Sequence, residues 1–169
     1  MSAADTLAVL RAFAAIPIVW AIAVDDTPVA FALFALAAIS DAIDGRLARR
    51  GTLRPRGAFL DPLADKILVL ATLVALALAG EVNAWLVGLI AAREAAVLAL
   101  RTRAYARGQR LPADTAAKAK TALEMIATAL LIGAPPPLSS LAAVLLLAAL
   151  IVGVVTLPRY LPGRVRRLA

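Results

Sequence analysis

The sequence contains no cysteine and no histidine among its 169 residues. Without cysteine the chain has neither disulfides nor thiolate chemistry, and without histidine it lacks the commonest general base and the usual zinc ligand. Acid–base chemistry therefore falls to aspartate, glutamate, lysine or tyrosine. The N-terminus also lacks a basic segment followed by a short apolar core and a small-residue cleavage site. We therefore expect the first apolar stretch to be a retained helix and not a signal peptide.

Apolar residues, by contrast, make up 63% of the sequence, and the mean hydropathy is +0.89. A soluble domain is usually about half apolar. A membrane-spanning helix needs about 20 mostly apolar residues, and the sequence offers such stretches at about 6–24, 28–50, 57–80, 83–105, 113–133 and 138–157. The sequence therefore predicts an all-α integral membrane protein with six transmembrane helices, forming one domain over residues 1–169.

Charge alternates along the connections between these stretches. The regions 46–56 and 101–120 and the tail 159–167 are rich in arginine and lysine, whereas the other three connections carry no basic residue. Basic loops favour the cytoplasmic side of a membrane, so both termini are predicted to be cytoplasmic in a multi-pass protein of the inner (cytoplasmic) membrane. Orientation and contacts with anionic lipids explain the net charge of +7. No nucleic-acid partner is expected.

Four aspartates, Asp41, Asp44, Asp61 and Asp65, lie where the second stretch ends and the third begins. Residues three or four apart share a helix face, so each pair is expected to point in one direction from its helix. Charged groups beside the bilayer core are costly and are kept mainly for function. Carboxylates suit Mg²⁺ or Mn²⁺, with phosphate oxygens completing the shell. The sequence therefore predicts a site at the cytoplasmic face for phosphate and divalent metal, with two ions.

Small and basic residues accompany the aspartates. Gly45 and Ala48 lie on or beside the face of the first aspartate pair, and Gly57 stands at the turn into the third helix, where a backbone can approach a ligand closely. Arg49 can donate two hydrogen bonds to a phosphate. Taken singly, each residue has a structural explanation, such as glycine packing between membrane helices or an ion pair between Asp44 and Arg49. The complete set in this order is harder to explain by packing.

The whole pattern is D-x2-D-G-x2-A-R-x7-G-x3-D-x3-D, beginning at Asp41 and ending at Asp65. It resembles the signature of the CDP-alcohol phosphatidyltransferases. Further similarity to the phosphatidylglycerophosphate synthase branch of that family lies at Arg11, Pro17, Lys66, Arg93, Glu94, Lys118, Lys120 and Thr121. The resemblance covers most of residues 5–130.

The resemblance implies a membrane enzyme of phospholipid biosynthesis, with its active site at the cytoplasmic face. An alcohol would attack the β-phosphorus of CDP-diacylglycerol and release CMP. Asp65 would be the general base. The implied metal ligands are Asp41, Asp44, Asp61 and Asp65. The implied CDP-lipid contacts are Asp41, Asp44, Gly45, Ala48, Arg49, Gly57 and Asp61.

The expected acceptor is glycerol 3-phosphate, whose phosphate needs cations beyond the metals. Candidates are Arg93, Arg101, Lys118 and Lys120, although membrane orientation and lipid headgroup contact explain Arg101 equally well. Within the family, inositol phosphate, serine or another alcohol is the alternative acceptor. Two alternatives are not enzymes: a divalent-cation transporter, disfavoured because all four motif aspartates lie at one membrane face, and a scaffold with a decayed site, disfavoured by the complete motif. Membrane lipids are expected neighbours, and a homodimer is compatible with these expectations.

Overall fold

A computed structural model describes residues 3–48, 57–107 and 115–160, without the side chains of residues 3–8, 41–48, 57–62, 65, 105 and 136–137. Within these ranges the chain is helical and has no strand. The elements are α1 (Ala3–Ala23), α2 (Thr27–Ala48), α3 (Gly57–Leu78), α4 (Ala84–Ala106), α5 (Thr115–Gly133), α6 (Pro136–Thr156) and the short 3-10 helix η1 (Leu157–Tyr160). The predicted all-α fold is confirmed, and each of the six predicted helices is present with bounds that differ by a few residues.

Tight turns join α1 to α2, α3 to α4 and α5 to α6. Asp25 and Gly80 adopt positive φ angles of 59° and 84°, which reverse the chain after α1 and α3. The side chains of Asp26 and Asn83 then accept hydrogen bonds from backbone N–H groups in the first turns of α2 and α4. Pro135 precedes α6, whose first turn contains proline, where the missing N–H has no intrahelical partner to lose. Each pair of helices is therefore an antiparallel hairpin.

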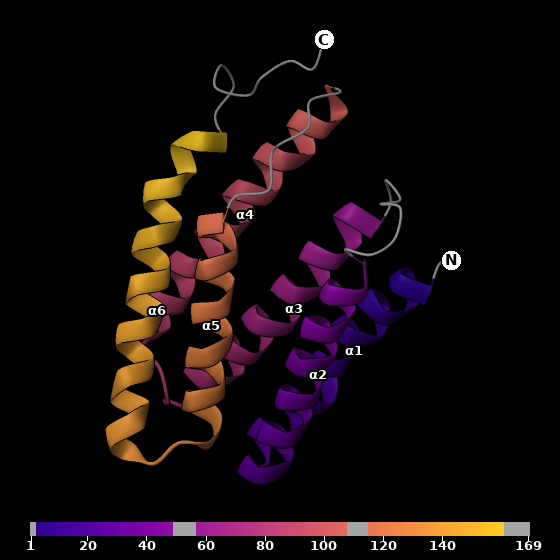
Figure 1. The fold of residues 1–169 in the computed structure, drawn as a ribbon. Helices are drawn as coiled ribbons and strands as arrows, with labels where there is room; N and C mark the ends of the chain where they lie inside the picture. The colour runs from indigo at the N-terminus through magenta and orange to yellow at the C-terminus, as the bar shows by residue number, and fades with distance from the viewer. Residues whose placement is uncertain (1–2, 49–56, 108–114, 161–169) are drawn as a thin grey trace.

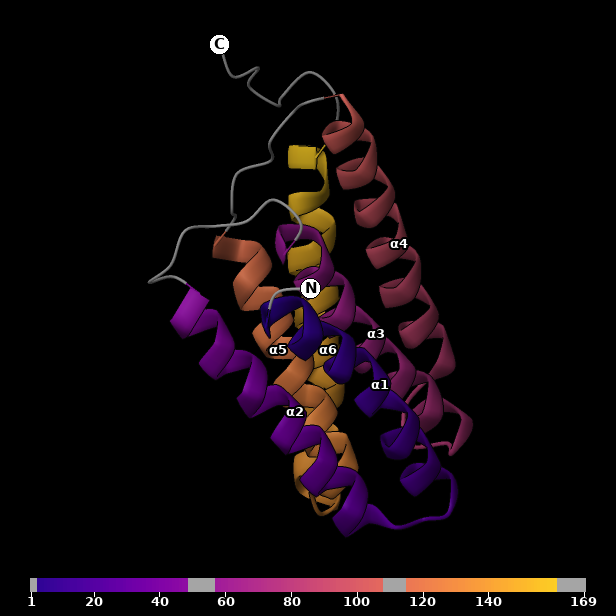
Figure 2. The ribbon, with the colours of Figure 1, turned by 90° about the vertical axis from the view of Figure 1, so that its right-hand side faces the viewer.

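The three hairpins pack into one bundle (Figures 1 and 2). α1 packs on α2 and α3, α5 packs on α2, α3 and α6, and α4 packs on α3 and α6. Fully buried side chains at the centre include Ile18, Phe34, Leu68, Ile90 and Leu146, one from each of five helices. Because the helices alternate in direction, the beginnings of α1, α3 and α5 share one end of the bundle with the ends of α2, α4 and α6. We call this the motif end.

Apolar side chains also cover the outside of the bundle. Exposed large apolar residues occur on every one of the six helices and include Trp20, Leu36, Leu78 and Trp85, the last two more than four-fifths exposed. By length and composition, one helix of the described part, Leu138–Tyr160, is able to cross a membrane. Shorter apolar helices are Val9–Ala23, Thr27–Ser40 and Lys66–Leu78.

Candidate active site

The first half of the aspartate motif lies on the final turns of α2. The helix continues without a break through Asp41 and Asp44 to Ala48, so the predicted helical spacing of this pair, with Gly45 beside it, is present in the backbone. Arg49 and the side chains of the other motif residues on α2 lie outside the described part of the structure. Their roles as metal and nucleotide ligands therefore stay predictions.

The second half lies on the opening turns of α3. Gly57 is the first residue of this helix, and Asp61 and Asp65 follow at a helical interval of four. Both motif segments occupy the motif end of the bundle (Figures 1 and 2). The side chains of Asp61 and Asp65 are also outside the described part, and among the side chains that are described no group of three acidic residues could hold a metal.

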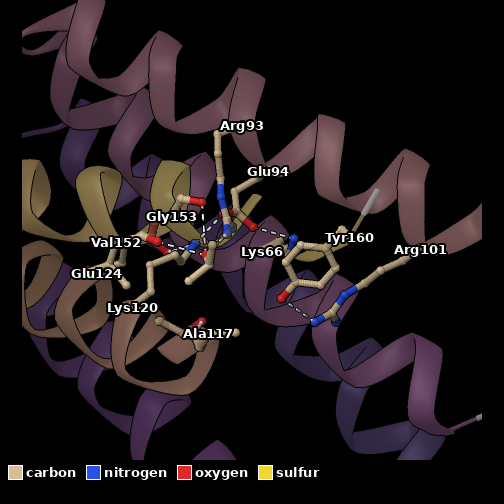
Figure 3. Close-up of polar contacts among 12 residues, drawn as sticks. Lys66, Arg93, Glu94, Arg101, Ala117, Lys120, Glu124, Val152, Gly153 and Tyr160 are labelled. Carbon is tan, nitrogen blue, oxygen red and sulfur yellow. Dashed lines mark hydrogen bonds and ion pairs between the residues drawn. The ribbon is translucent and has the colours of Figure 1, made fainter. Parts of the chain in front are cut away.

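A buried ion cluster begins at the residue after Asp65. Lys66 of α3 pairs with Glu94 of α4, and Glu94 also pairs with its neighbour Arg93 and with Lys120 of α5. Lys120 also pairs with Glu124, which lies one turn further along α5, at 2.8 Å between Lys120 Nζ and Glu124 Oε2. Figure 3 shows these side chains converging from three helices. We call the five residues Lys66, Arg93, Glu94, Lys120 and Glu124 the buried ion cluster.

Glu94 is the centre of the cluster. Its side chain is only 3% exposed, and each of its two carboxylate oxygens is paired with at least one cationic side chain. Oε1 accepts from Arg93 Nη1 at 2.5 Å and also from Lys120 Nζ, whereas Oε2 faces Lys66 Nζ. Charges buried between helices persist only when they are paired and hydrogen-bonded. One carboxylate therefore holds cations from three different helices in place.

The charges of the cluster do not cancel. Counted over these five described side chains alone, three cations and two carboxylates leave a formal charge of +3 − 2 = +1 when all five groups are ionised. An unbalanced buried charge is unfavourable, and a bound anion would restore balance. The cluster is therefore suited to an anionic group such as a phosphate, which favours charged, bidentate donors.

The structure brings together two of the four predicted acceptor cations. Arg93 and Lys120 both belong to the buried ion cluster. Arg101 lies further along α4, where its guanidinium stands 5.3 Å from the ring centroid of Tyr160 and Nη2 donates to the Tyr160 hydroxyl at 3.5 Å. Lys118 is exposed near the start of α5. Contact of any of the four with an acceptor stays a prediction.

The sequence alone does not predict that the carboxylates of the cluster belong to a site. It marks Glu94 only as one of the residues similar to the phosphatidylglycerophosphate synthase branch, and it gives no role to Glu124. A signal was present, because Lys120 and Glu124 are four residues apart inside an apolar helix, and ionisable residues in apolar helices face the bundle interior and pair. That signal predicts burial and pairing, but it does not reveal which helices supply the partners.

Comparison with known proteins identifies the family of the chain. Residues 1–155 match the family model for CDP-alcohol phosphatidyltransferase, so the chain belongs to the CDP-alcohol phosphatidyltransferase family. The family predicted from the motif is thereby confirmed.

Relatives within the family point to one branch. The chain is 39% identical over 130 residues to a probable phosphatidylglycerophosphate synthase of Mycobacterium tuberculosis, which covers 76% of this chain and 62% of the relative. It is 42% identical over 114 residues (63% and 58%) to the CDP-diacylglycerol–glycerol-3-phosphate 3-phosphatidyltransferase of Pseudomonas fluorescens, and 38% identical over 128 residues (71% and 66%) to the protein of the same name in Escherichia coli. The matches thus span between 58% and 66% of the length of these relatives.

Proposed function

We propose that this chain is a phosphatidylglycerophosphate synthase. It transfers the phosphatidyl group of CDP-diacylglycerol to glycerol 3-phosphate and releases CMP. The names of its relatives support the reaction. The buried ion cluster is the structural observation that supports a phosphate-bearing acceptor. It has an excess of positive charge, and its member Lys66 directly follows the proposed base Asp65 on α3.

The proposed metal site fits divalent ions. Its four donors are carboxylates, supplied in two pairs at helical spacing by α2 and α3 at the same end of the bundle. Hard oxygen donors of this kind favour Mg²⁺ or Mn²⁺, and two ions match the two pairs. When bound, such ions neutralise the pyrophosphate of the CDP-lipid and stabilise the departing CMP. Asp41, Asp44 and Asp61 are the proposed ligands, with Asp65 shared or adjacent.

The remaining steps belong to residues of the chain. Asp65 accepts the proton of the acceptor hydroxyl as its oxygen forms a bond to the β-phosphorus, and the bond from that phosphorus to the CMP oxygen breaks. Gly45, Ala48 and Gly57 leave room for the nucleotide beside the helix ends, and Arg49 donates to the pyrophosphate. Arg93 and Lys120 bind the acceptor phosphate, with Lys118 and Arg101 as further candidates nearer the surface.

The bundle is proposed to lie in the bacterial inner membrane with six spans and both termini in the cytoplasm. The exposed apolar side chains on all six helices support this placement, because soluble monomers rarely expose large continuous apolar surface. The five charged residues of the buried ion cluster are paired with one another, as is expected for intramembrane charges. The apolar faces also leave room for a homodimer alongside lipid contacts.

A cation-transport function receives little support from the interior of the bundle. The buried acids Glu94 and Glu124 are paired with lysine and arginine side chains, and the cluster carries excess positive charge. Such a cluster repels a divalent cation at short range. The observation therefore favours the transferase over the transporter.

The acceptor is tested directly with purified full-length protein. With CDP-diacylglycerol and Mg²⁺, CMP is expected to be released with glycerol 3-phosphate and to stay near background with serine or inositol, because only a phosphate ester compensates the excess positive charge of the cluster. Inositol phosphate is tested as well, because it is the alternative acceptor that also carries a phosphate. CMP release is measured by chromatography. Faster release with serine than with glycerol 3-phosphate would refute the proposed acceptor.

The membrane orientation is tested by labelling single cysteines, since the chain has none of its own. Ala79→Cys and Thr115→Cys place a thiol at exposed positions on opposite ends of the bundle. In intact cells an impermeant maleimide is expected to label Ala79→Cys, and to label Thr115→Cys only after permeabilisation. Because basic connections favour the cytoplasm, labelling of Thr115→Cys from outside would reverse the proposed orientation.

A further inference from the structure

We propose that α6 positions the guanidinium of Arg93 for the acceptor phosphate through two residues, Gly153 and Thr156. We call these two residues the α6 contact. The inference rests on the proposed function, and it gives a role to a helix that carries no motif residue. Arg93 would bind the acceptor, whereas Gly153 and Thr156 would be positioning residues that act through it.

Gly153 provides the space that Arg93 occupies. A Cβ atom built on Gly153 would lie 2.8 Å from Arg93 Nε and 3.3 Å from its Cδ and Cζ atoms. Real Cβ atoms essentially never approach another atom as closely as 2.8 Å, so any larger residue here forces the arginine to move. Figure 3 shows Gly153 of α6 close to Arg93. The absence of a side chain at residue 153 is therefore what lets the arginine lie against α6.

Thr156 orients the far end of the same side chain. Arg93 Nη2 donates to Thr156 Oγ1 at 3.3 Å, and the hydroxyl itself donates to the carbonyl oxygen of Val152 at 2.8 Å. The hydroxyl proton is thus directed at the backbone, which leaves a lone pair for the guanidinium. Thr156 is 3% exposed and is the one polar side chain that the sequence places between residues 141 and 156. A hydroxyl in such an apolar helix requires an explanation, and Arg93 provides one.

Opposing contacts fix the plane of the guanidinium. Glu94 accepts from Nη1 on one side at 2.5 Å, and Thr156 accepts from Nη2 on the other. Within the described residues Nε has no hydrogen-bond partner and packs against Gly153. A guanidinium binds an anion best when its rigid planar fork is held in the correct direction before the ligand arrives. Loss of the contacts with α6 would leave Glu94 as the dominant partner and turn the fork towards it.

Two substitutions disturb the α6 contact in different ways, and each has a matched control. Thr156→Val removes the acceptor oxygen at constant shape, whereas Thr156→Ser keeps it. Gly153→Ala displaces the arginine, whereas Gly88→Ala adds the same methyl group to α4 at an exposed position with nothing within 4 Å. Arg93→Ala is included to test whether the arginine binds the acceptor at all.

The experiment measures CMP release by the full-length protein while glycerol 3-phosphate and CDP-diacylglycerol are varied separately. Thr156→Val and Gly153→Ala are expected to raise KM for glycerol 3-phosphate by roughly three- to tenfold, with kcat and KM for CDP-diacylglycerol close to those of the wild type. Thr156→Ser and Gly88→Ala are expected to behave like the wild type. A purely structural role for the α6 contact would not separate the two substrates in this way.

The contrary outcomes are distinguishable. If the wild type releases no CMP with glycerol 3-phosphate, the proposed function fails and this inference with it. If Arg93→Ala raises KM for the acceptor but Thr156→Val and Gly153→Ala do not, the arginine site stands and the role of α6 is refuted. The inference is also refuted if both α6 variants lower kcat and raise both KM values together, because that pattern indicates general damage to the fold.

Discussion

Alanine at Asp41, Asp44 or Asp61 is expected to lower CMP release by about 10²–10³-fold or more. Divalent ions contribute several kcal/mol of charge stabilisation in a displacement at phosphorus, and each substitution removes one carboxylate of the proposed ligand set on α2 and α3. The substitution Asp65→Asn tests the proposed base separately. It keeps the shape of the side chain but removes its ability to accept a proton, so turnover is expected to fall by about 10²–10⁴-fold while the variant still binds CDP-diacylglycerol. Turnover and lipid binding are measured on the same preparation.

A matched acid at the opposite end of the bundle controls for the loss of a carboxylate. Asp25→Asn keeps a residue that tolerates positive φ in an exposed turn, and it should retain wild-type turnover.

Chelator is expected to abolish the activity of the wild type, and added Mg²⁺ or Mn²⁺ should restore it. Full turnover in excess chelator would exclude the metal-dependent reaction.

Glu94→Gln is expected to destabilise the bundle strongly. The change keeps the shape of the side chain but removes the anion that Lys66, Arg93 and Lys120 share. Breaking a buried ion pair by removing one partner costs about 3–5 kcal/mol, which corresponds to a fall in Tm of about 6–20 °C for a chain of this size. Thermal unfolding of the detergent-solubilised protein is the measurement.

The other glutamates provide a graded comparison. Glu124 contacts Lys120 alone among the cations of the cluster, so Glu124→Gln is expected to lower Tm by less than Glu94→Gln. Glu81 is exposed in the turn between α3 and α4, where a single charge contributes little to stability. Glu81→Gln should therefore have the same Tm as the wild type. Equal Tm values for Glu94→Gln and Glu81→Gln would contradict the central role of Glu94.

The elements of the fold were predictable because their signals are local. Apolar length alone predicts six helices, and turn-forming residues stand at two of the boundaries that the structure shows. Gly80 stands where α3 stops, and the prolines from Pro135 onwards stand where α6 starts. The motif was predictable for the same reason, since its aspartates are close together in the sequence and their helical spacing is set by α2 and α3 themselves.

The buried ion cluster was not predictable in the same way. Its members come from α3, α4 and α5, and each helix is apolar on most of its circumference, so hydropathy says little about which face turns inwards. Arg93 and Lys120 were predicted as ligands of the acceptor from their charge, but their shared partner depends on how the helices pack. The sequence around Gly153 and Thr156 does not indicate a role for either residue, because that role depends on the position of Arg93 on another helix.

The three tight turns have a consequence for how the protein enters a membrane. In the proposed orientation these three turns are connections that must cross the bilayer. The first carries Asp25 and Asp26, the second carries Glu81, and the third, at Ala134 and Pro135, carries no charge. These turns are very short and carry no lysine or arginine, whereas the basic residues lie in the connections that stay behind. Because translocating a charge through hydrocarbon is costly, each helical hairpin can then be inserted as a unit with few charges to carry across. The distribution of charge that orients the finished protein would therefore also lower the barrier to its biogenesis.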